Sequence, residues 1–375
     1  MTRVLLDCRP VRDPISGVAR YCLGLSEALT RLARQEFDHF VQTQRGKNSF
    51  VSLLPTSDTQ ISSRIFAGDR RIQNALLEYL PRLQSLLIPG QHDILHETYF
   101  ANLGTRHGKP KLATIHDIIP LDRPEFFSRR NVIYSKRNFH RQAREADHII
   151  AVSEFTRQRI LDFYPEAENR ISVIGNGVDA SILNRPVAQR LKPDDTLAQR
   201  PFVGFVGNVE PRKNLVTMAR GFDQAFPKGS GWQMVIAGRM NFDADRILTE
   251  ITSILGDRFT YLGPVDEARK WQVLAHAQAV VMASEYEGFG IPIYEGYAVD
   301  TPVMIANNSS MTELAVTPQQ LFPTFSPDAL AEGLRAIADG ADWVEHARKS
   351  GANRVASQSW DEVAMATSAI YEKLA

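Results

Sequence analysis

The chain of 375 residues is 43% apolar, and its 43 basic side chains balance 43 acidic ones. This length exceeds what one hydrophobic core usually fills, so we expect two domains. The balance of charge gives no indication of a nucleic-acid partner, and no apolar run approaches the roughly 20 residues of a membrane-spanning helix. Two cysteines without Cys-x-x-Cys spacing indicate core residues, not a metal or redox site. Residues 1–7 are typical of a strand and not of a signal peptide, so we expect a cytoplasmic protein.

The first half of the chain alternates short apolar runs with helical patterns. Strands are predicted at residues 4–6, 93–96, 111–115, 148–152 and 171–174. A first helix is predicted after Gly17, because apolar residues recur at steps of three and four from Val18 to Leu32. The alternation predicts a doubly wound parallel sheet. His116 and Ser153 follow two of its strands, although a lone histidine is often structural and a serine there also suits a helix cap.

Charge is unevenly spread along the chain. Residues 1–185 contain 26 basic and 20 acidic side chains, a balance of +6, and the remainder contains 17 and 23, a balance of −6. The sharpest concentration is an acid-free helical stretch with the basic residues Arg129, Arg130, Lys136, Arg137, Arg141 and Arg144. A basic amphipathic helix is typical of a membrane-surface element, and a solvated helix is the alternative. We therefore expect either a solvated face or peripheral contact with the inner face of the cytoplasmic membrane.

The second half repeats the alternation. Strands are predicted at residues 202–206, 233–237, 259–262, 279–283 and 302–306, which gives a second parallel sheet. The polar segment 183–200 contains two prolines and no clean period, so it is interpreted as the interdomain linker. A final helix is predicted from Trp360 to Leu374.

A turn suited to a diphosphate follows the first strand of the second half. Gly207 and Asn208 come directly after that strand, and Arg212 and Lys213 follow them. Lysine supplies a mobile point charge and arginine a planar fork for paired phosphate oxygens. Cations at a helix start oppose the helix dipole unless an anion binds there, which weighs against a merely exposed helix start.

The segment 284–296 is the most informative of the chain. Glu287 and Glu295 stand eight positions apart around the turn of Gly288 and Gly290, between an apolar strand and a helix. In open α/β sheets, ligands bind at this carboxyl edge. The glycines permit close backbone approach to an anion or sugar, and Glu295 is placed to accept hydrogen bonds from vicinal hydroxyls such as those of a ribose. The alternative is an ordinary helix start with a capping carboxylate.

The pair Asp243 and Asp245 has the Asp-x-Asp spacing of a known metal-binding motif, but it coincides with a predicted helix start where aspartate caps are ordinary. No cluster of histidine, cysteine and carboxylate has metal-ligand spacing. We therefore expect no metal and no bound cofactor.

Several segments in chain order carry a resemblance to one family. They are residues 16–21, 114–120, 151–154, 176–179, 205–215 and 284–296. Over nearly the whole chain they resemble the retaining GT-B glycosyltransferases of family 4, whose signature of Glu, seven residues, Glu matches residues 287–295. The resemblance is specific for fold and broad activity and weak for the sugar.

The resemblance implies a GT-B fold, with two Rossmann-like, doubly wound parallel-sheet domains facing across a cleft. The acceptor-binding domain would span residues 1–185 and the nucleotide-sugar-binding domain residues 186–358. The last helix, residues 359–375, would pack back on the first domain. Closure of the domains would exclude water from the donor.

It also implies roles for the residues named above. Arg212 and Lys213 would stabilise the departing diphosphate, Glu287 would position the sugar, and His116 would hydrogen-bond the sugar or the acceptor. Glu295 would bind the ribose. Other donor contacts are expected from Gly17, Ser153, Gly207, Asn208, Gly263, Val265, Gly288, Phe289 and Gly290. Many relatives carry arginine where this chain has Asn208, so Arg212 is expected to cover for the missing cation.

The implied activity is retaining transfer of a hexose from a nucleoside diphosphate sugar to a glycan or lipid-linked acceptor in surface-polysaccharide biosynthesis, with GDP-mannose favoured as donor. Retention implies either a double displacement or attack on the donor's own face; no carboxylate is clearly placed as a nucleophile, which favours same-face attack. A non-catalytic sugar-nucleotide sensor is an alternative. A nicotinamide dehydrogenase is disfavoured because no Gly-x-Gly-x-x-Gly motif follows the first strand. A nucleotide kinase is disfavoured because the sequence has no Gly-x-x-x-x-Gly-Lys-Ser/Thr motif.

Overall fold

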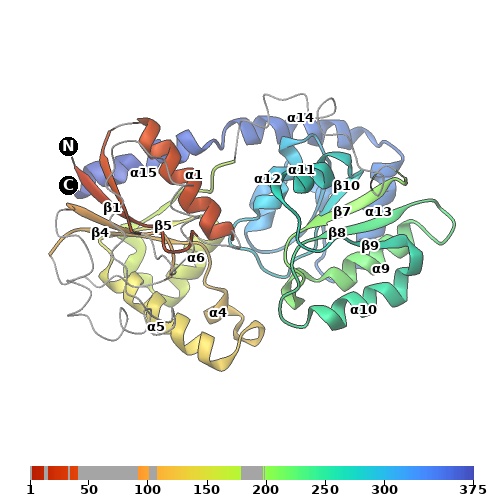
Figure 1. The fold of residues 1–375 in the computed structure, drawn as a ribbon, viewed down its shortest axis with the longest axis horizontal. Helices are drawn as coiled ribbons and strands as arrows, with labels where there is room; N and C mark the ends of the chain where they lie inside the picture. Colours follow the sequence, from red (N-terminus) through yellow and green to blue (C-terminus); the bar gives the residue numbers. More distant parts are fainter. Residues whose placement is uncertain are drawn as a thin grey trace, which may run out of the picture. The chain divides into compact units, whose positions relative to one another are not determined.

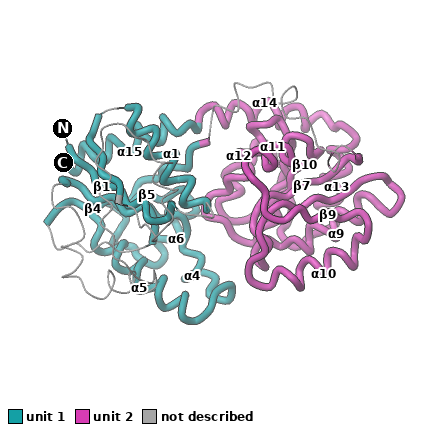
Figure 2. Tube along the Cα trace, viewed as in Figure 1, with its two compact units in different colours: residues 1–177, 358–375 teal, residues 178–357 magenta. Residues whose placement is uncertain are grey.

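The computed structural model describes residues 2–11, 16–32, 34–40, 92–100, 108–178, 197 and 199–375 (Figure 1). The chain forms two compact units: unit 1 comprises residues 1–177 and 358–375, and unit 2 comprises residues 178–357 (Figure 2). The domain boundary expected at 185/186, and all of the expected linker except residues 197, 199 and 200, lie outside the described residues.

Unit 1 contains a six-stranded parallel sheet. Its strands are β1 (Arg3–Asp7), β2 (Glu36–Phe40), β3 (Ile94–Glu97), β4 (Lys111–Ile115), β5 (His148–Ala151) and β6 (Ile171–Val173). They are ordered β2-β1-β3-β4-β5-β6, and every neighbouring pair is parallel. The chain order reverses between β1 and β3, so the carboxyl ends of these two strands form the place where doubly wound sheets bind ligands.

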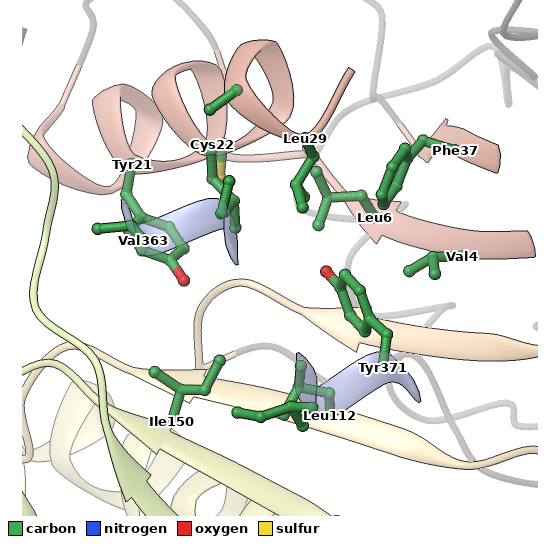
Figure 3. Packing of buried hydrophobic residues seen from close by; sticks show 14 of the residues in the cluster. Val4, Leu6, Tyr21, Cys22, Leu29, Phe37, Leu112, Ile150, Val363 and Tyr371 are labelled. Carbon is green, nitrogen blue, oxygen red and sulfur yellow. The ribbon is translucent and has the colours of Figure 1, made fainter. Parts of the chain in front are cut away.

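Helices cover both faces of this sheet. They are α1 (Gly17–Leu32), α4 (Ile119–Asp122), α5 (Arg129–Glu145), α6 (Glu154–Phe163) and α15 (Trp360–Leu374), with short 3-10 turns η2 (Pro124–Phe126) and η3 (Pro165–Arg170). Helices α1 and α15 pack on one face, with Leu112 of β4 in their core cluster (Figure 3). The next residue, Ala113, faces the opposite cluster with α5 and α6. Successive strand residues point to opposite faces, so this alternation fixes the two layers.

The C-terminal helix α15 belongs to unit 1. Trp360 at its start packs so closely on Gly24 and Gly177 that a Cβ added to either glycine would lie 2.2 or 2.4 Å from the indole. Farther along, the Tyr371 hydroxyl is 2.6 Å from Nδ1 of the buried His96. These contacts join the last helix to α1 and to the middle of the sheet.

Unit 2 repeats the architecture. Its strands are β7 (Phe202–Val206), β8 (Gln233–Ala237), β9 (Phe259–Tyr261), β10 (Ala279–Met282), β11 (Val303–Ala306) and β12 (Leu321–Phe322). They are ordered β12-β11-β10-β7-β8-β9, again with only parallel neighbours. The chain order reverses between β7 and β10. Two doubly wound parallel sheets are therefore present, as the sequence predicts.

The helices of unit 2 are α9 (Leu215–Ala225), α10 (Ala244–Leu255), α11 (Glu267–His276), α12 (Ile291–Ala298), α13 (Pro327–Ala338) and α14 (Asp342–Ala356). The 3-10 turns are η4 (Pro211–Lys213), η5 (Gly256–Arg258), η6 (Ser309–Leu314) and η7 (Pro318–Gln320). Helix α9 packs against α10 and α13, and α12 packs against α11 and α14 (Figure 1). In the described part of the chain, no helix combines the length and hydrophobicity needed to cross a bilayer.

Candidate functional site

The carboxyl edge of the unit 2 sheet has a glycine after each of three adjacent strands. Gly207 follows β7, Gly238 follows β8 and Gly263 lies two residues beyond β9. The Gly207 N–H donates to the Ala237 carbonyl at 2.9 Å, and the Gly238 N–H donates to the Gly263 carbonyl at 2.8 Å. A Cβ on Gly238 would lie 1.8 Å from the Gly207 carbonyl oxygen. The main chains therefore approach as closely as glycine permits, a contact that the sequence analysis did not foresee.

A compact charged cluster lies beside this edge, next to the point where the strand order reverses. Arg212 Nη1 is 3.0 Å from Glu287 Oε2, and Lys213 Nζ pairs with the other oxygen of the same carboxylate. Arg212 Nη2 is 2.8 Å from Glu210, which also accepts from Asn241 Nδ2 at 2.7 Å. Because β7 and β10 are neighbours, the loops that follow them bring residues 74 positions apart into contact. The structure thus unites three of the residues that the sequence singled out.

The electrostatics of the cluster follow from burial and pairing. Burial alone would raise the pKa of Glu287, but Arg212 and then Lys213 outweigh it and lower that pKa from 4.5 to about 2. Burial, followed by the charge of Arg212, lowers the pKa of Lys213, while Glu287 opposes the shift. Since the pKa of Glu287 is lower in the folded than in the unfolded chain, these pairs stabilise the fold above about pH 4.5 and are lost as the pH falls towards 2.

The acidic loop is supported by the segment that follows β11. The Glu287 N–H donates to Ser309 Oγ at 3.1 Å, and Ser310 Oγ donates to the carbonyls of Glu287 and Phe289 at 2.9 and 3.0 Å. The sequence analysis missed these two serines. The run Asn307-Asn308-Ser309-Ser310 directly after a strand was the available signal, because polar clusters at strand ends mark loops that are fixed by side chains.

The glycines of the acidic turn differ in conformation. Gly290 has a φ of 107° and precedes α12, whereas Gly288 is not among the positive-φ residues. Phe289 is buried and stacks on Tyr294 with ring centroids 5.3 Å apart. The Phe289 ring therefore packs the loop onto α12, and the Ile293 N–H donates to the Gly290 carbonyl at 3.0 Å where that helix begins.

Glu295 lies in α12 and is only 7% exposed. Its Oε1 accepts a hydrogen bond of 2.7 Å from Lys270 Nζ on α11. Lys270 is itself 4% exposed, and the sequence analysis did not single it out. The two predicted acids therefore have separate cations: Glu287 pairs with Arg212 and Lys213, and Glu295 pairs with Lys270 of α11.

In unit 1, His116 directly follows β4 and is partly buried. Its Nε2 lies 2.9 Å from the Thr98 carbonyl, and its ring meets the Tyr21 ring edge-on at 4.8 Å. Burial lowers the pKa of His116 to about 4, so the ring is neutral at neutral pH. A carbonyl only accepts, so Nε2 carries the proton and Nδ1 is an acceptor. That tautomer suits a hydrogen bond from a sugar hydroxyl.

Four further residues predicted to contact the donor lie at strand or helix ends. Gly17 is the first residue of α1, and Ser153 caps α6 by accepting from the Thr156 N–H at 3.0 Å. Asn208 is exposed after β7, and Val265 precedes α11 and is partly exposed. The cap accounts for Ser153 without a ligand, which is the structural alternative that the sequence left open.

The Asp-x-Asp segment is a helix start, as expected, but its aspartate does not cap. Asp243 precedes α10 with a φ of 59°, makes no cap hydrogen bond and pairs with Arg246 at 2.6 Å. Among the described residues, no group of histidine, cysteine and carboxylate has the arrangement of a metal site. Cys8 and Cys22 are both buried, and burial raises the pKa of Cys22 to about 12, in keeping with unreactive core thiols.

Two family models match consecutive parts of the chain. Glycosyltransferase Family 4 matches residues 15–182, and Glycosyl transferases group 1 matches residues 189–354. A full-length relative, O-antigen chain mannosyltransferase B of Escherichia coli, is 25% identical and the match covers 99% of this chain and 100% of that one.

Solved structures share the fold over the full length. Sucrose-phosphate synthase from Thermosynechococcus elongatus superposes with a TM-score of 0.78 at 19% identity, covering 100% of this chain and 99% of that one. Anabaena Alr3699/HepE in complex with UDP-glucose gives a TM-score of 0.75 at 18% identity and complete coverage of both chains. With two parallel sheets, a charged cluster where the strand order of the second reverses, and both family models in tandem, the chain belongs to the GT-B glycosyltransferases of the family 4 type.

Proposed function

We propose that the protein is a retaining, metal-independent hexosyltransferase that uses a nucleoside diphosphate sugar, with GDP-mannose as the favoured donor. The cluster of Arg212, Lys213 and Glu287 is the observation that carries this proposal. Two cations next to close-packed main chain, where the strand order reverses, suit a diphosphate. A binding protein that only senses nucleotides needs no neutralisation of charge that grows during a reaction, so the paired cations favour the enzyme.

The proposed chemistry assigns one task to each group. Arg212 and Lys213 receive the negative charge that develops on the departing diphosphate, which lowers the barrier to breaking the bond to the sugar. Glu287 is already ionised; once the diphosphate competes for the two cations, its carboxylate accepts from the sugar hydroxyls. Glu295 accepts from the ribose, and neutral His116 accepts from a sugar or acceptor hydroxyl through Nδ1.

We propose that the configuration of the sugar is retained by same-face attack. In same-face attack, the acceptor hydroxyl approaches from the side of the leaving group, and a diphosphate oxygen takes its proton. A double displacement instead requires a carboxylate that attacks the anomeric carbon, whereas the proposal assigns Glu287 to the sugar hydroxyls and Glu210 is paired with Arg212. An NMR assay of the product anomer in excess EDTA should show retention and full turnover; inversion, or activity that returns only with magnesium or manganese, would contradict the proposal.

The favoured sugar and pathway rest on the relative of equal length, which is named as an O-antigen mannosyltransferase. We propose mannosyl transfer to a glycan or lipid-linked acceptor in surface-polysaccharide biosynthesis. Because a ligand that binds only the native state raises its melting temperature, GDP and GDP-mannose should raise it more than UDP and UDP-glucose. A larger shift with the uridine compounds would reassign the donor, and no shift with any of the four would refute the nucleotide site.

Membrane contact is proposed for the basic face of α5. Phe139 on this helix is only 1% exposed, so the apolar side packs in the protein core. The side chains of Lys136, Arg137 and Arg144 are exposed, and Ile133, about one turn before Lys136, is 71% exposed. Binding would therefore be mainly electrostatic. Flotation should show binding to vesicles with anionic lipid that fades with salt; equal recovery with neutral vesicles would contradict this contact.

A further inference from the structure

The buried lysine of α11 makes an arrangement that the proposed chemistry does not use. Lys270 Nζ lies 2.7 Å from Glu295 Oε1 and 2.8 Å from Glu267 Oε2, and 4.2 Å from the centroid of the Trp271 ring. An ammonium group has three N–H donors. Two carboxylates and one aromatic face thus surround this cation.

The two carboxylates differ strongly in exposure. The side chain of Glu267 is 57% exposed, whereas those of Glu295 and Lys270 are 9% and 5% exposed. An ion pair as buried as Lys270 with Glu295 usually adds little net stability over apolar residues of similar size, because both charges lose their hydration. Fold stability alone therefore gives a weak reason for a lysine at this position.

What the pair does provide is a carboxylate of fixed direction. A buried glutamate without a cation would be held in its charged form at a large cost. A carboxylate has two oxygens and about four acceptor positions, so it can accept from more than one donor. Side chains that are fixed in advance bind a ligand without the cost of ordering them on binding.

We propose that Lys270 is a positioning residue, which holds the Glu295 carboxylate oriented to accept hydrogen bonds from the ribose hydroxyls of the donor nucleotide. The inference rests on the proposed function, because it requires Glu295 to face a ribose. It makes α11 part of the donor site.

The test compares affinities for a ribonucleotide and for the same nucleotide without its hydroxyls. Calorimetry would measure GDP against 2′,3′-dideoxy-GDP, and UDP against 2′,3′-dideoxy-UDP. Hydrogen bonds to a charged acceptor contribute about 1.5–3 kcal/mol, so the wild-type protein should prefer the ribose form by roughly 10- to 150-fold. Glu295→Ala should reduce this preference to near unity, and Lys270→Met should reduce it at least fivefold.

Glu267→Gln is the matched control, because it removes the exposed partner of the same lysine and should leave the preference unchanged. Lys270→Gln, which is neutral but still donates a hydrogen bond, replaces the methionine variant if that variant does not fold, and should reduce the preference at least threefold. A preference lost in Glu295→Ala but kept in both Lys270 variants would overturn the role of Lys270 and leave the proposed function intact. A preference kept in Glu295→Ala, or the binding of no nucleotide by the wild type, would overturn the ribose site itself and the inference with it.

Discussion

Replacing Lys213 with alanine should lower kcat for sugar transfer by about 100- to 1,000-fold, as removal of one group that stabilises developing charge usually does. Lys213 is 8% exposed and is paired with Glu287, so its ammonium group is fixed before the donor binds. The negative charge of the diphosphate grows as its bond to the sugar breaks. The loss should therefore fall mainly on kcat and only modestly on the affinity for the donor.

The matched control is Lys228→Ala, because Lys228 belongs to the same unit but is exposed. This change should leave kcat within about twofold, as surface changes away from a site usually have small effects. Both variants would be followed by nucleotide release in the presence of acceptor. A Lys213→Ala enzyme with near-normal kcat and weakened donor binding would show that the lysine binds the ground state and the transition state equally and does not lower the barrier.

Replacing Gly238 with alanine should reduce the free energy of unfolding by about 4 kcal/mol or more, among the largest effects expected of a single substitution. The added Cβ would lie 1.8 Å from the Gly207 carbonyl oxygen and 3.4 Å from the Asn208 nitrogen. Both neighbours are main chain, which cannot rotate away. The ends of β7 and β8 would have to separate, and the turn of Gly207 and Asn208 after β7 would move with them.

Gly229→Ala separates this clash from the cost of an unusual backbone angle. Gly229 also has a positive φ, 90°, but nothing lies within 4 Å of a Cβ added there. The Gly229→Ala substitution should lower the free energy of unfolding by only about 1–2 kcal/mol, the usual cost of a left-handed residue with a Cβ. Urea denaturation of both variants checks the comparison. Equal losses would show that the two strand ends do not approach each other as described.

The sequence predicted the strands inside each sheet, and also the edge strands β6 and β9, because they are short apolar runs. It missed β2 and β12. The segment Glu36–Phe40 contains two acids and a histidine, and an edge strand paired on one side tolerates such residues. Strand β12 has two residues, too few for any period. Pairing with β1 and β11 decides these elements, and single-sequence patterns do not report pairing.

The same limit applies to the candidate site. The convergence of Arg212, Lys213 and Glu287 could be anticipated, because all three follow strands whose carboxyl ends share one edge of a parallel sheet. The pairing of Glu295 with Lys270 could not be anticipated. Lys270 lies in a polar helix that has the pattern of a solvated face, and only the packing of α11 on α12 buries it. Gly238 was visible as a glycine after a strand, but its contact with Gly207 depends on the register of β7 and β8.

A structure of the protein with bound GDP or UDP tests the central claim most directly. The account predicts diphosphate oxygens within hydrogen-bond distance of Arg212 and Lys213, beside the main chain at Gly207, and a ribose whose hydroxyls donate to Glu295. Glu287 should then have exchanged at least one of its cations for the diphosphate. A nucleotide bound elsewhere, with the cluster of Arg212, Lys213 and Glu287 unchanged, would contradict it.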